Sequence, residues 1–222
     1  DELHVVSILQ SILESPYQSI LQFANPQEPK GDFLHLNSVK YIDARMASQL
    51  PVAAEGDLLI SLRQIDVVAV LDPIEGTIKW AARGPWHHQH DIDLLPDGRM
   101  LVFDNRGDLK HGGTSRVLEL NPSSMEIFWE YPGDSAELLY TSIYGSQQRL
   151  PNGNTLISES NNGRLLEVTR DGEIVWEYRI PERKVDFRGN TVATAVFGQR
   201  FNRTELPFLD QATNKAVLGK QP

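Results

Sequence analysis

Three stretches of the chain share one arrangement of apolar and polar positions, and each ends with an isoleucine two residues before a tryptophan. The stretches read LDPIEGTIKW, LNPSSMEIFW and VTRDGEIVW. Their tryptophans, Trp80, Trp129 and Trp176, follow one another at intervals of 49 and 47 residues. Alternating apolar and polar residues are typical of half-buried strands, and Asp-Pro, Asn-Pro and Asp-Gly pairs are typical of turns. The pattern therefore predicts a repeated unit of β-strands, with the tryptophans packed between units.

Each unit contains further predicted strands before the one that ends in tryptophan. The first strands of the three units read HLNSVKYI, HQHDIDLL and IYGSQQRL. The second strands read EGDLLISLR, DGRMLVFDN and NGNTLISES. The third strands read IDVVAVLD, SRVLELN and GRLLEVT. Four short strands in about 40–50 residues are typical of a β-propeller blade. An immunoglobulin-like sandwich would not need this internal similarity. We therefore predict an all-β chain, a β-propeller with four-stranded blades over residues 32–82, 83–132 and 133–180.

The two ends of the chain fit the repeat less well. In residues 1–31, apolar residues at helical spacing indicate a helix, whereas SPYQSILQF resembles a strand that ends a blade, and both interpretations stay open. In residues 181–222, GNTVATAVFGQRF predicts a closing strand, followed by a tail. All of these segments are expected to form one propeller domain. Propellers have about four to eight blades, so three blades do not close a ring. The ring would be completed by a longer chain, by a further blade from the N-terminal segment, or by a second chain in a homo-oligomer.

Composition and charge narrow the range of partners. The 222 residues carry a formal net charge of −9 and have a pI of about 5.1. This acidic balance argues against nucleic acid as a partner, because phosphate binding needs a basic surface. No apolar run approaches the roughly 20 residues that a membrane-spanning helix needs. The chain has no cysteine, so disulfides and thiolate metal sites do not exist, and we expect no cofactor.

The first strand of each unit is expected to line the central channel of the propeller. Side chains two residues apart point the same way along a strand. When the first strands are aligned by their ends, His35 and His88 share one channel-facing position, and Asn37 and His90 share the next. His87 should point away. His88 and His90 also suit a shared metal ion, but few further ligands are within reach, so no metal site is expected.

The second strands end in polar residues at one repeat position, occupied by Arg63, Asn105 and a serine. We expect Arg63 and Asn105 to border the channel pocket. Arg106 and Arg116 stand on either side of the glycine-rich insertion RGDLKHGGTS, which is expected to cover the site. Polar residues at strand ends are more often turn or cap residues, and that interpretation stays open for each of them.

Four motifs, taken together and in this order, resemble the arylsulfotransferase family. They are HLNSV at 35–39, SLR at 61–63, QHDIDLLPDGRMLVFDN at 89–105 and RLPNGNTLI at 149–157, and the similarity extends over residues 32–180. The resemblance implies a propeller enzyme that transfers a sulfuryl group from a phenolic ester to another phenol without a nucleotide sulfate donor. It also implies an aromatic sulfate or phenol as the small-molecule partner, and a secreted or periplasmic location.

The resemblance further implies a covalent sulfohistidine mechanism. His35 and His90 match family histidines in the HxN and QHD motifs, and Asn37 matches the polar partner of the first motif. Arg106 or Arg116 would correspond to the family arginine after FDN, where this chain has an insertion. The family's nucleophilic histidine belongs in a later blade, where this chain has no histidine and where a tyrosine and a serine lie near the expected position.

Arginine and histidine side chains suit this chemistry, since a transferring sulfuryl group carries negative charge on its oxygens and imidazole can form a covalent intermediate. The expected catalytic residues are His90, His35 and His88. The expected substrate-binding residues are Asn37, Arg63, Asn105, Arg106, Arg116 and Tyr144. A non-catalytic propeller that binds a ligand or a partner is the alternative, and the missing late histidine favours it.

Overall fold

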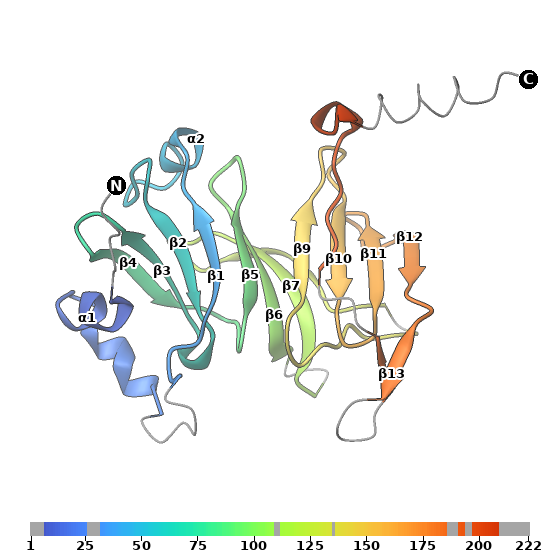
Figure 1. Ribbon diagram of the computed structural model, residues 1–222, viewed down its shortest axis with the longest axis horizontal. Helices are drawn as coiled ribbons and strands as arrows, with labels where there is room; N and C mark the ends of the chain where they lie inside the picture. The colour runs from blue at the N-terminus through green and yellow to red at the C-terminus, as the bar shows by residue number, and fades with distance from the viewer. Residues whose placement is uncertain are drawn as a thin grey trace, which may run out of the picture.

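Three four-stranded antiparallel sheets stand side by side in the computed structural model, and the strands of each sheet follow chain order (Figure 1). The prediction of an all-β propeller with four-stranded blades is confirmed. The exact limits of the predicted blades stay a proposal. The structure describes residues 7–25, 32–108, 112–134, 136–185, 191–193 and 197–208.

The first sheet contains β1 (Leu36–Tyr41), β2 (Leu58–Leu62), β3 (Val67–Asp72) and β4 (Thr77–Arg83). The second contains β5 (His90–Leu94), β6 (Met100–Asp108), β7 (Thr114–Leu120) and β8 (Ile127–Tyr131). The third contains β9 (Ser146–Arg149), β10 (Thr155–Glu159), β11 (Arg164–Val168) and β12 (Ile174–Arg179), and a hairpin follows with β13 (Arg183–Val185) and β14 (Thr191–Ala193). The short helices are α1 (Ile8–Leu13), η1 (Gln18–Phe23), α2 (Ala44–Ala47), η2 (Arg63–Ile65) and η4 (Arg203–Glu205). In the described part of the chain, no helix combines the length and the apolar character needed to cross a membrane.

The repeated tryptophans share an irregularity in the register of the two outer strands. Trp80 of β4 lies opposite Val70 of β3, but Ile78, two residues earlier, lies opposite the very next residue, Leu71. The same shift occurs between β7 and β8 and between β11 and β12. Such a β-bulge places one extra residue in the outer strand. As a result, Ile78 packs on one face of the sheet and Trp80 on the other.

The core consists of the apolar layers between neighbouring sheets. Between the first and second sheets, Trp86 is fully buried, and its Nε1 donates a hydrogen bond to the carbonyl oxygen of Asp66 over 3.0 Å. Between the second and third sheets, Trp129, Tyr131 and Phe103 are the largest buried side chains. Burial of one such side chain stabilises the fold by about 1.5–3 kcal/mol. These layers fix how the first strands of neighbouring sheets lie, and therefore position the residues discussed below.

The N-terminal segment covers the outer face of the first sheet. Ser7 caps α1, and its Oγ accepts a hydrogen bond from the backbone N–H of Gln10 over 3.3 Å. Ile12 of α1 and Ile20 of η1 are buried against the face of β2, β3 and β4 that points away from the second sheet. The helical interpretation therefore holds for Ile8–Leu13, and most of SPYQSILQF forms a 3₁₀ helix rather than a strand.

At the other end, residues 197–201 cross the outer face of the third sheet. The side chain of Arg200 pairs with Glu167 and lies over the ring of the repeat tryptophan in β12, 5.5 Å from its centroid. Arg149 of β9 makes the same two contacts one sheet earlier, with Glu119 and with the tryptophan of β8. The segment therefore takes the place of the first strand of a following blade, although it is not itself assigned as a strand.

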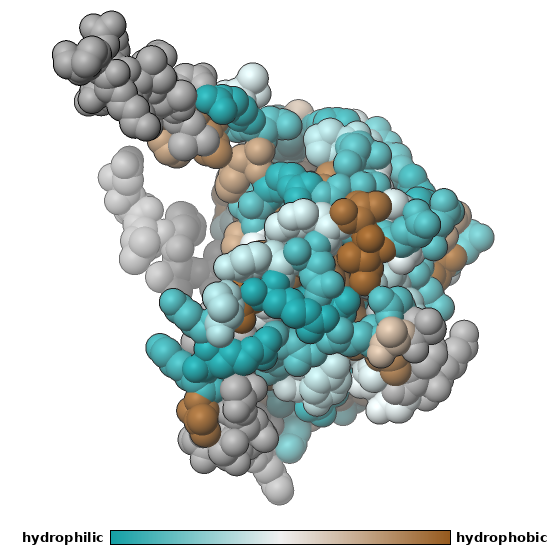
Figure 2. Space-filling view, turned by 90° about the vertical axis from the view of Figure 1, so that its right-hand side faces the viewer, coloured by the Kyte–Doolittle hydropathy of each residue, from teal (hydrophilic) through white to brown (hydrophobic). Residues whose placement is uncertain are grey.

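The closing strand predicted in GNTVATAVFGQRF is only partly present in the described residues. Within that stretch, β14 is a strand, and it pairs with β13 rather than with the third sheet. Figure 2 looks onto this side of the molecule and shows a largely hydrophilic surface with a narrow hydrophobic patch. The exposed apolar and aromatic residues of β12 and of the segment after it include Val175, Trp176, Tyr178, Phe197 and Phe201.

Candidate functional site

His90, the first residue of β5, is the centre of the candidate site. Its Nδ1 lies 2.7 Å from Oδ1 of Asn105 and 3.2 Å from the carbonyl oxygen of His88. Both neighbours are acceptors, so Nδ1 carries the proton and donates it. Nε2 then has the lone pair, and the backbone N–H of Tyr144 donates to it over 3.3 Å. Burial is the main reason why the pKa of His90 is lowered to about 4, so the imidazole is neutral at neutral pH.

Asn105 of β6 is fully buried beside His90. Its Nδ2 donates to the carbonyl oxygens of Thr141 and Tyr144, both over 2.8 Å, and its Oδ1 accepts from the imidazole. Both amide hydrogens are therefore used inside the protein. The structure places Asn105, a predicted substrate-binding residue, where it fixes the tautomer and the orientation of His90.

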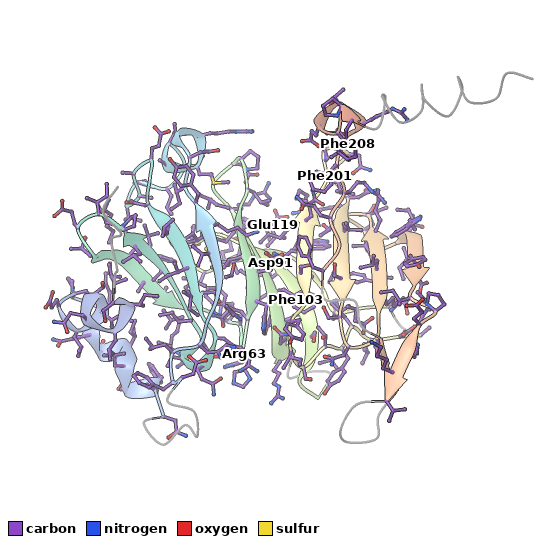
Figure 3. The ribbon with its side chains drawn as sticks, in the orientation of Figure 1. Arg63, Asp91, Phe103, Glu119, Phe201 and Phe208 are labelled. Carbon is purple, nitrogen blue, oxygen red and sulfur yellow. The ribbon has the colours of Figure 1, made fainter. Side chains whose placement is uncertain are left out.

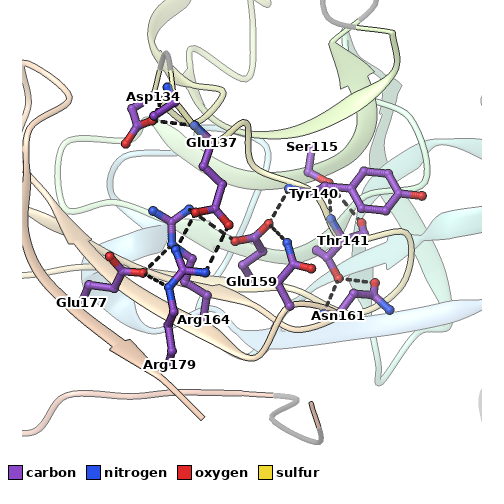
Figure 4. Close-up of polar contacts among 12 residues, drawn as sticks. Ser115, Asp134, Glu137, Tyr140, Thr141, Glu159, Asn161, Arg164, Glu177 and Arg179 are labelled. Atoms are coloured by element: carbon purple, nitrogen blue, oxygen red, sulfur yellow. Dashed lines mark hydrogen bonds and ion pairs between the residues drawn. The ribbon is translucent and has the colours of Figure 1, made fainter. Parts of the chain in front are cut away.

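Residues 139–145 form the loop that brings Tyr144 against the imidazole. Figure 4 shows how this loop is attached to its surroundings. The backbone N–H of Thr141 donates to Oγ of Ser115 over 2.9 Å, and Oγ1 of Thr141 donates to Oδ1 of Asn161 over 2.6 Å. Ser115 belongs to the second sheet and Asn161 follows a strand of the third, so the loop is anchored to both sheets and Tyr144 is held between them.

A pocket of about 200 Å³ opens beside His90. The first strands of all three sheets and the segment from residue 197 contribute to its wall. The half-exposed ring of Tyr144 lies with its centroid 6.4 Å from that of the imidazole. The structure thus brings three of the predicted residues together at one pocket. Its lining residues are Asn37, Ser38, His90, Asp91, Tyr144, Gly145, Ser146 and Phe197.

His35, His88 and Arg63 belong to the same region but do not line this pocket. Nη2 of Arg63 lies 3.5 Å from Nδ1 of His88, and burial followed by the charge of Arg63 lowers the pKa of His88. His35 is more exposed, and its Nδ1 lies 2.7 Å from the carboxylate of Asp32. After burial, the charges of Arg63 and His35 also contribute to the lowered pKa of His90. These side chains therefore share one electrostatic environment.

The backbone has a positive φ at several non-glycine residues of this region, which include His35 at 53°, His88 at 55°, Asp91 at 40° and Tyr144 at 62°. Residues other than glycine rarely adopt this conformation, and such strain is concentrated at functional sites. His35 and His88 occupy the same repeat position, and an aspartate stabilises each of them. Asp32 accepts the backbone N–H of His35 over 3.1 Å, and Asp66 accepts that of His88 over 2.8 Å.

Two carboxylates hold the loop that carries the histidines of the second unit. Asp66 accepts a hydrogen bond from Nδ1 of His87 over 3.1 Å, so this side chain is turned to Asp66 and does not line the pocket. Asp104, fully buried, accepts the backbone N–H of His87 and Nε of Arg116, each over 2.9 Å. The structure therefore places Arg116, predicted to bind substrate, in this support of the loop. The exposed Arg106 donates its backbone N–H to the carbonyl oxygen of His87 over 3.2 Å and does not line the pocket.

The wall of the pocket also contains Ser38, Asp91 and Phe197, which the sequence did not predict as site residues. The register of β1 shifts between Leu36 and Ser38, and that of β5 shifts between His90 and Ile92. Simple alternation does not hold across such a bulge, which is why it did not assign Ser38 and Asp91 to the pocket. Among the residues that the structure describes, no group of three or more histidine, aspartate or glutamate side chains could hold a metal ion.

Several solved propeller structures align with this chain at low sequence identity. A Bacteroides caccae protein of unknown function is 17% identical, with a TM-score of 0.43 over 71% of this chain and 52% of that one. The WD40 β-propeller domain of Doa1 is 11% identical, with a TM-score of 0.45 over 70% and 46%. A virginiamycin B lyase from Staphylococcus aureus is 18% identical, with a TM-score of 0.39 over 57% and 38%. The chain spans about half the length of these structures or less.

The comparison with protein families gives a match over most of the chain. The model of the arylsulfotransferase (ASST) family matches residues 1–181, which include all three four-stranded sheets and the four motifs identified above. None of the curated proteins matches the chain. On the family match, this chain belongs to the arylsulfotransferase family.

Proposed function

We propose that this chain transfers a sulfuryl group between phenolic sulfate esters and phenols at the pocket beside His90. The observation that carries the proposal is the state of this histidine, a buried neutral imidazole whose Nδ1–H is held by Asn105. Its Nε2 lone pair is directed to Tyr144, a residue of the pocket wall. Membership of the arylsulfotransferase family supports the same reaction.

In the proposed first step, Nε2 of His90 attacks the sulfur atom of an aryl sulfate. An N–S bond forms while the ester S–O bond breaks, and the donor leaves as a phenolate. In the second step, the hydroxyl oxygen of an acceptor phenol attacks the sulfur, the N–S bond breaks, and the acceptor's proton passes to solvent. Covalent catalysis of this kind replaces one difficult displacement by two easier ones.

The low pKa of His90 suits a nucleophile better than a proton acceptor. A side chain with a pKa of about 4 keeps its lone pair unprotonated at neutral pH, but it is a weak base for a phenol. The hydrogen bond from Tyr144 to Nε2, at 3.3 Å, is longer than the usual distance of about 2.9–3.0 Å, so little is lost when the substrate displaces it.

Positive and polar groups near His90 would stabilise the sulfuryl oxygens in this proposal. Asn37 belongs to the pocket wall, where its Nδ2 donates to the carbonyl oxygen of Gln89 over 2.7 Å. Arg63 and His35 contribute from the same region. Their charges lower the pKa of His90, which supports a field that also acts on a bound anion, by the logic of charge stabilisation in group transfer.

The test uses 4-nitrophenyl sulfate as donor and 1-naphthol as acceptor. We expect release of 4-nitrophenolate that depends on the acceptor, together with formation of naphthyl sulfate seen by mass spectrometry. His90→Asn should lower the rate by a factor of about 10² or more, because a nucleophile cannot be replaced by binding alone. His87→Asn is the matched control, since this neighbouring histidine is turned to Asp66, and it should keep the rate.

Two results would contradict the proposal. One is a folded wild-type protein that releases no 4-nitrophenolate with the acceptor present. The other is a His90→Asn protein that keeps the wild-type rate. Quenching the reaction in the absence of acceptor and mapping the modified peptide gives a third readout, because the sulfuryl group should then be found on His90.

A non-catalytic propeller that binds aromatic sulfates is the second candidate function. It is favoured by Gly145, which occupies the repeat position of His90 in the third sheet, so the late histidine of the family is missing. It is also favoured by the backbone N–H that already occupies Nε2. Calorimetric binding of 4-nitrophenyl sulfate without release of the phenol would support this candidate over the enzyme.

We also propose a secreted or periplasmic location and an aromatic sulfate or phenol as the partner, on the strength of the family alone. Completion of the propeller ring, by a second copy or by a further chain segment, is likewise a proposal. It is supported by the exposed outer face of the third sheet.

A further inference from the structure

Glu119 of β7 is buried between the second and third sheets and is surrounded by three guanidinium groups. Figure 3 shows it at the junction of these sheets. Arg149, at the end of β9, places Nη2 2.5 Å from its Oε2, and Arg170, in the turn after β11, places Nη2 3.1 Å from its Oε1. Arg99, in the turn before β6, contacts the same carboxylate. Three cations from three turns or strand ends thus converge on one anion.

The charges in this cluster do not balance. Arg99 also pairs with Asp97, so three positive groups face two negative ones. The corresponding position of the third sheet is Glu167, and it is satisfied differently, by one arginine and the side-chain amides of Asn152 and Asn154. Pairing with a buried glutamate therefore does not require three arginines, and the excess charge at Glu119 calls for another explanation.

The cluster also borders a pocket that is open to solvent. This pocket of about 470 Å³ is lined by the three arginines and both carboxylates, and its remaining wall is formed by Leu95, Pro96 and Gly153. The guanidinium groups of Arg149 and Arg170 lie 5.1 Å and 5.7 Å from the ring centroid of Trp129. Contact with an aromatic face fixes such cations without neutralising them. The groups that would meet a ligand are thus held in position beforehand.

Electrostatics within the cluster point the same way. Burial is the main cause that lowers the pKa of Arg149, and the charges of Arg170 and Arg99 lower it further, against the opposing effect of Glu119. The cations therefore repel one another in spite of the shared glutamate. An anion placed among them would relieve this repulsion.

We propose that this pocket, the Glu119 pocket, binds a tetrahedral oxyanion such as sulfate or phosphate. Guanidinium groups donate paired hydrogen bonds to such anions, and three of them approaching from different directions suit a tetrahedral group better than a planar carboxylate. The pocket is separate from the one beside His90, because Leu95 follows the end of β5 whereas His90 begins it.

The test is calorimetric titration of the full chain at constant ionic strength, with sodium sulfate, sodium phosphate, sodium benzoate and sodium chloride as separate titrants. We expect saturable binding of sulfate or phosphate, weaker binding of benzoate, and no heat of binding from chloride. Arg170→Gln should weaken the binding about tenfold or more, since it removes one charged donor. Arg99→Gln gives a second variant at an independent position of the same pocket.

Arg179→Gln is the matched control. Arg179 has 46% of its side chain exposed, against 44% for Arg170, and it is also ion-paired with a glutamate, Glu137, as Figure 4 shows. It should leave the binding unchanged. Three results would each overturn the proposal. They are an equal loss of binding in the control, a dissociation constant for both sulfate and phosphate weaker than about 10 mM, and tighter binding of benzoate than of either anion. Sulfuryl transfer in the Arg170→Gln protein should be retained, so this result is independent of the proposed function.

Discussion

At the residue scale, the burial of a neutral imidazole gives His90 a measurable signature. Its pKa is lowered from 6.5 to about 4 in the folded chain. Between these two values the unfolded chain binds a proton that the folded chain does not, so acidification in this window favours unfolding. This proton uptake lowers the free energy of unfolding by about 3 kcal/mol at pH 4, and the loss disappears above pH 7.

The direct measurement is an NMR titration of the imidazole carbon-bound protons of His90, with a midpoint expected near pH 4. The second measurement is the free energy of unfolding in urea at pH 7 and at pH 4.5. His90→Asn should lose less stability between the two than the wild type does, because its amide takes up no proton. A midpoint near the ordinary value for histidine would refute the buried, neutral state and with it the nucleophile proposed above.

For the residues of the site, the repeat alignment predicts the region in which they lie but not their hydrogen-bond partners. The repeat alignment predicts that His35, His88 and His90 lie in one region, because equivalent positions of successive sheets lie near the same axis. The roles of Asn105 and Arg116 could not be predicted from the repeat alignment. Alternation tells which side of a strand a residue occupies, but it does not identify a partner that comes from a separate loop, such as the carbonyl groups that Asn105 binds.

At the element scale, the entry into β9 depends on a glycine. Gly145 has a φ of 98°, and a Cβ atom there would lie 2.4 Å from the ring of Phe103. Gly153, in the turn between β9 and β10, has a similar φ of 87° but open space where its Cβ atom would be. The two positions therefore share the backbone strain of a substitution and differ in the clash.

We expect Gly145→Ala to lower the free energy of unfolding by about 2–5 kcal/mol, since left-handed strain and overpacking against a buried ring add up. Gly153→Ala should lower it by about 1 kcal/mol, from the strain alone. Urea denaturation of both variants provides the comparison. Equal losses would show that Phe103 moves aside, and that the layer between the second and third sheets is looser than the structure indicates.

The strands themselves were predictable from the repeat, because four-stranded sheets need regular alternation and turns at regular distances. The bulges were not, although the constant Ile-x-Trp spacing contained the signal: an extra residue places the two side chains on opposite faces of the sheet. The N-terminal segment stayed ambiguous for a different reason. Short apolar stretches fit a helix or a strand until the sheet face that they cover is known.

At the scale of the whole molecule, the faces of the three sheets are covered unequally. Trp129 and Tyr131 of the second sheet have 9% and 2% of their surface exposed, because the third sheet packs on them. Their repeat equivalents in the third sheet, Trp176 and Tyr178, have 41% and 47% exposed. Side chains that are buried at one blade junction are thus open at the next, and residues 197–201 cover only part of that face.

Such a face favours association, since aromatic and apolar side chains that are buried at one blade junction are exposed at the next. We expect the 222-residue chain to form dimers or larger assemblies at high concentration, and more so at high salt, because a net charge of −9 opposes contact between copies. Light scattering after size-exclusion chromatography measures this directly.

Tyr178→Lys should shift the protein to the monomer, because the new charge would have to be buried in the contact. Ile74→Lys, at an apolar residue of a turn in the first sheet with 76% of its surface exposed, should leave the association unchanged. A wild-type chain that stays monomeric at every concentration and salt would show that residues 197–201 already satisfy the third sheet, whereas a loss in both variants would place the contact elsewhere.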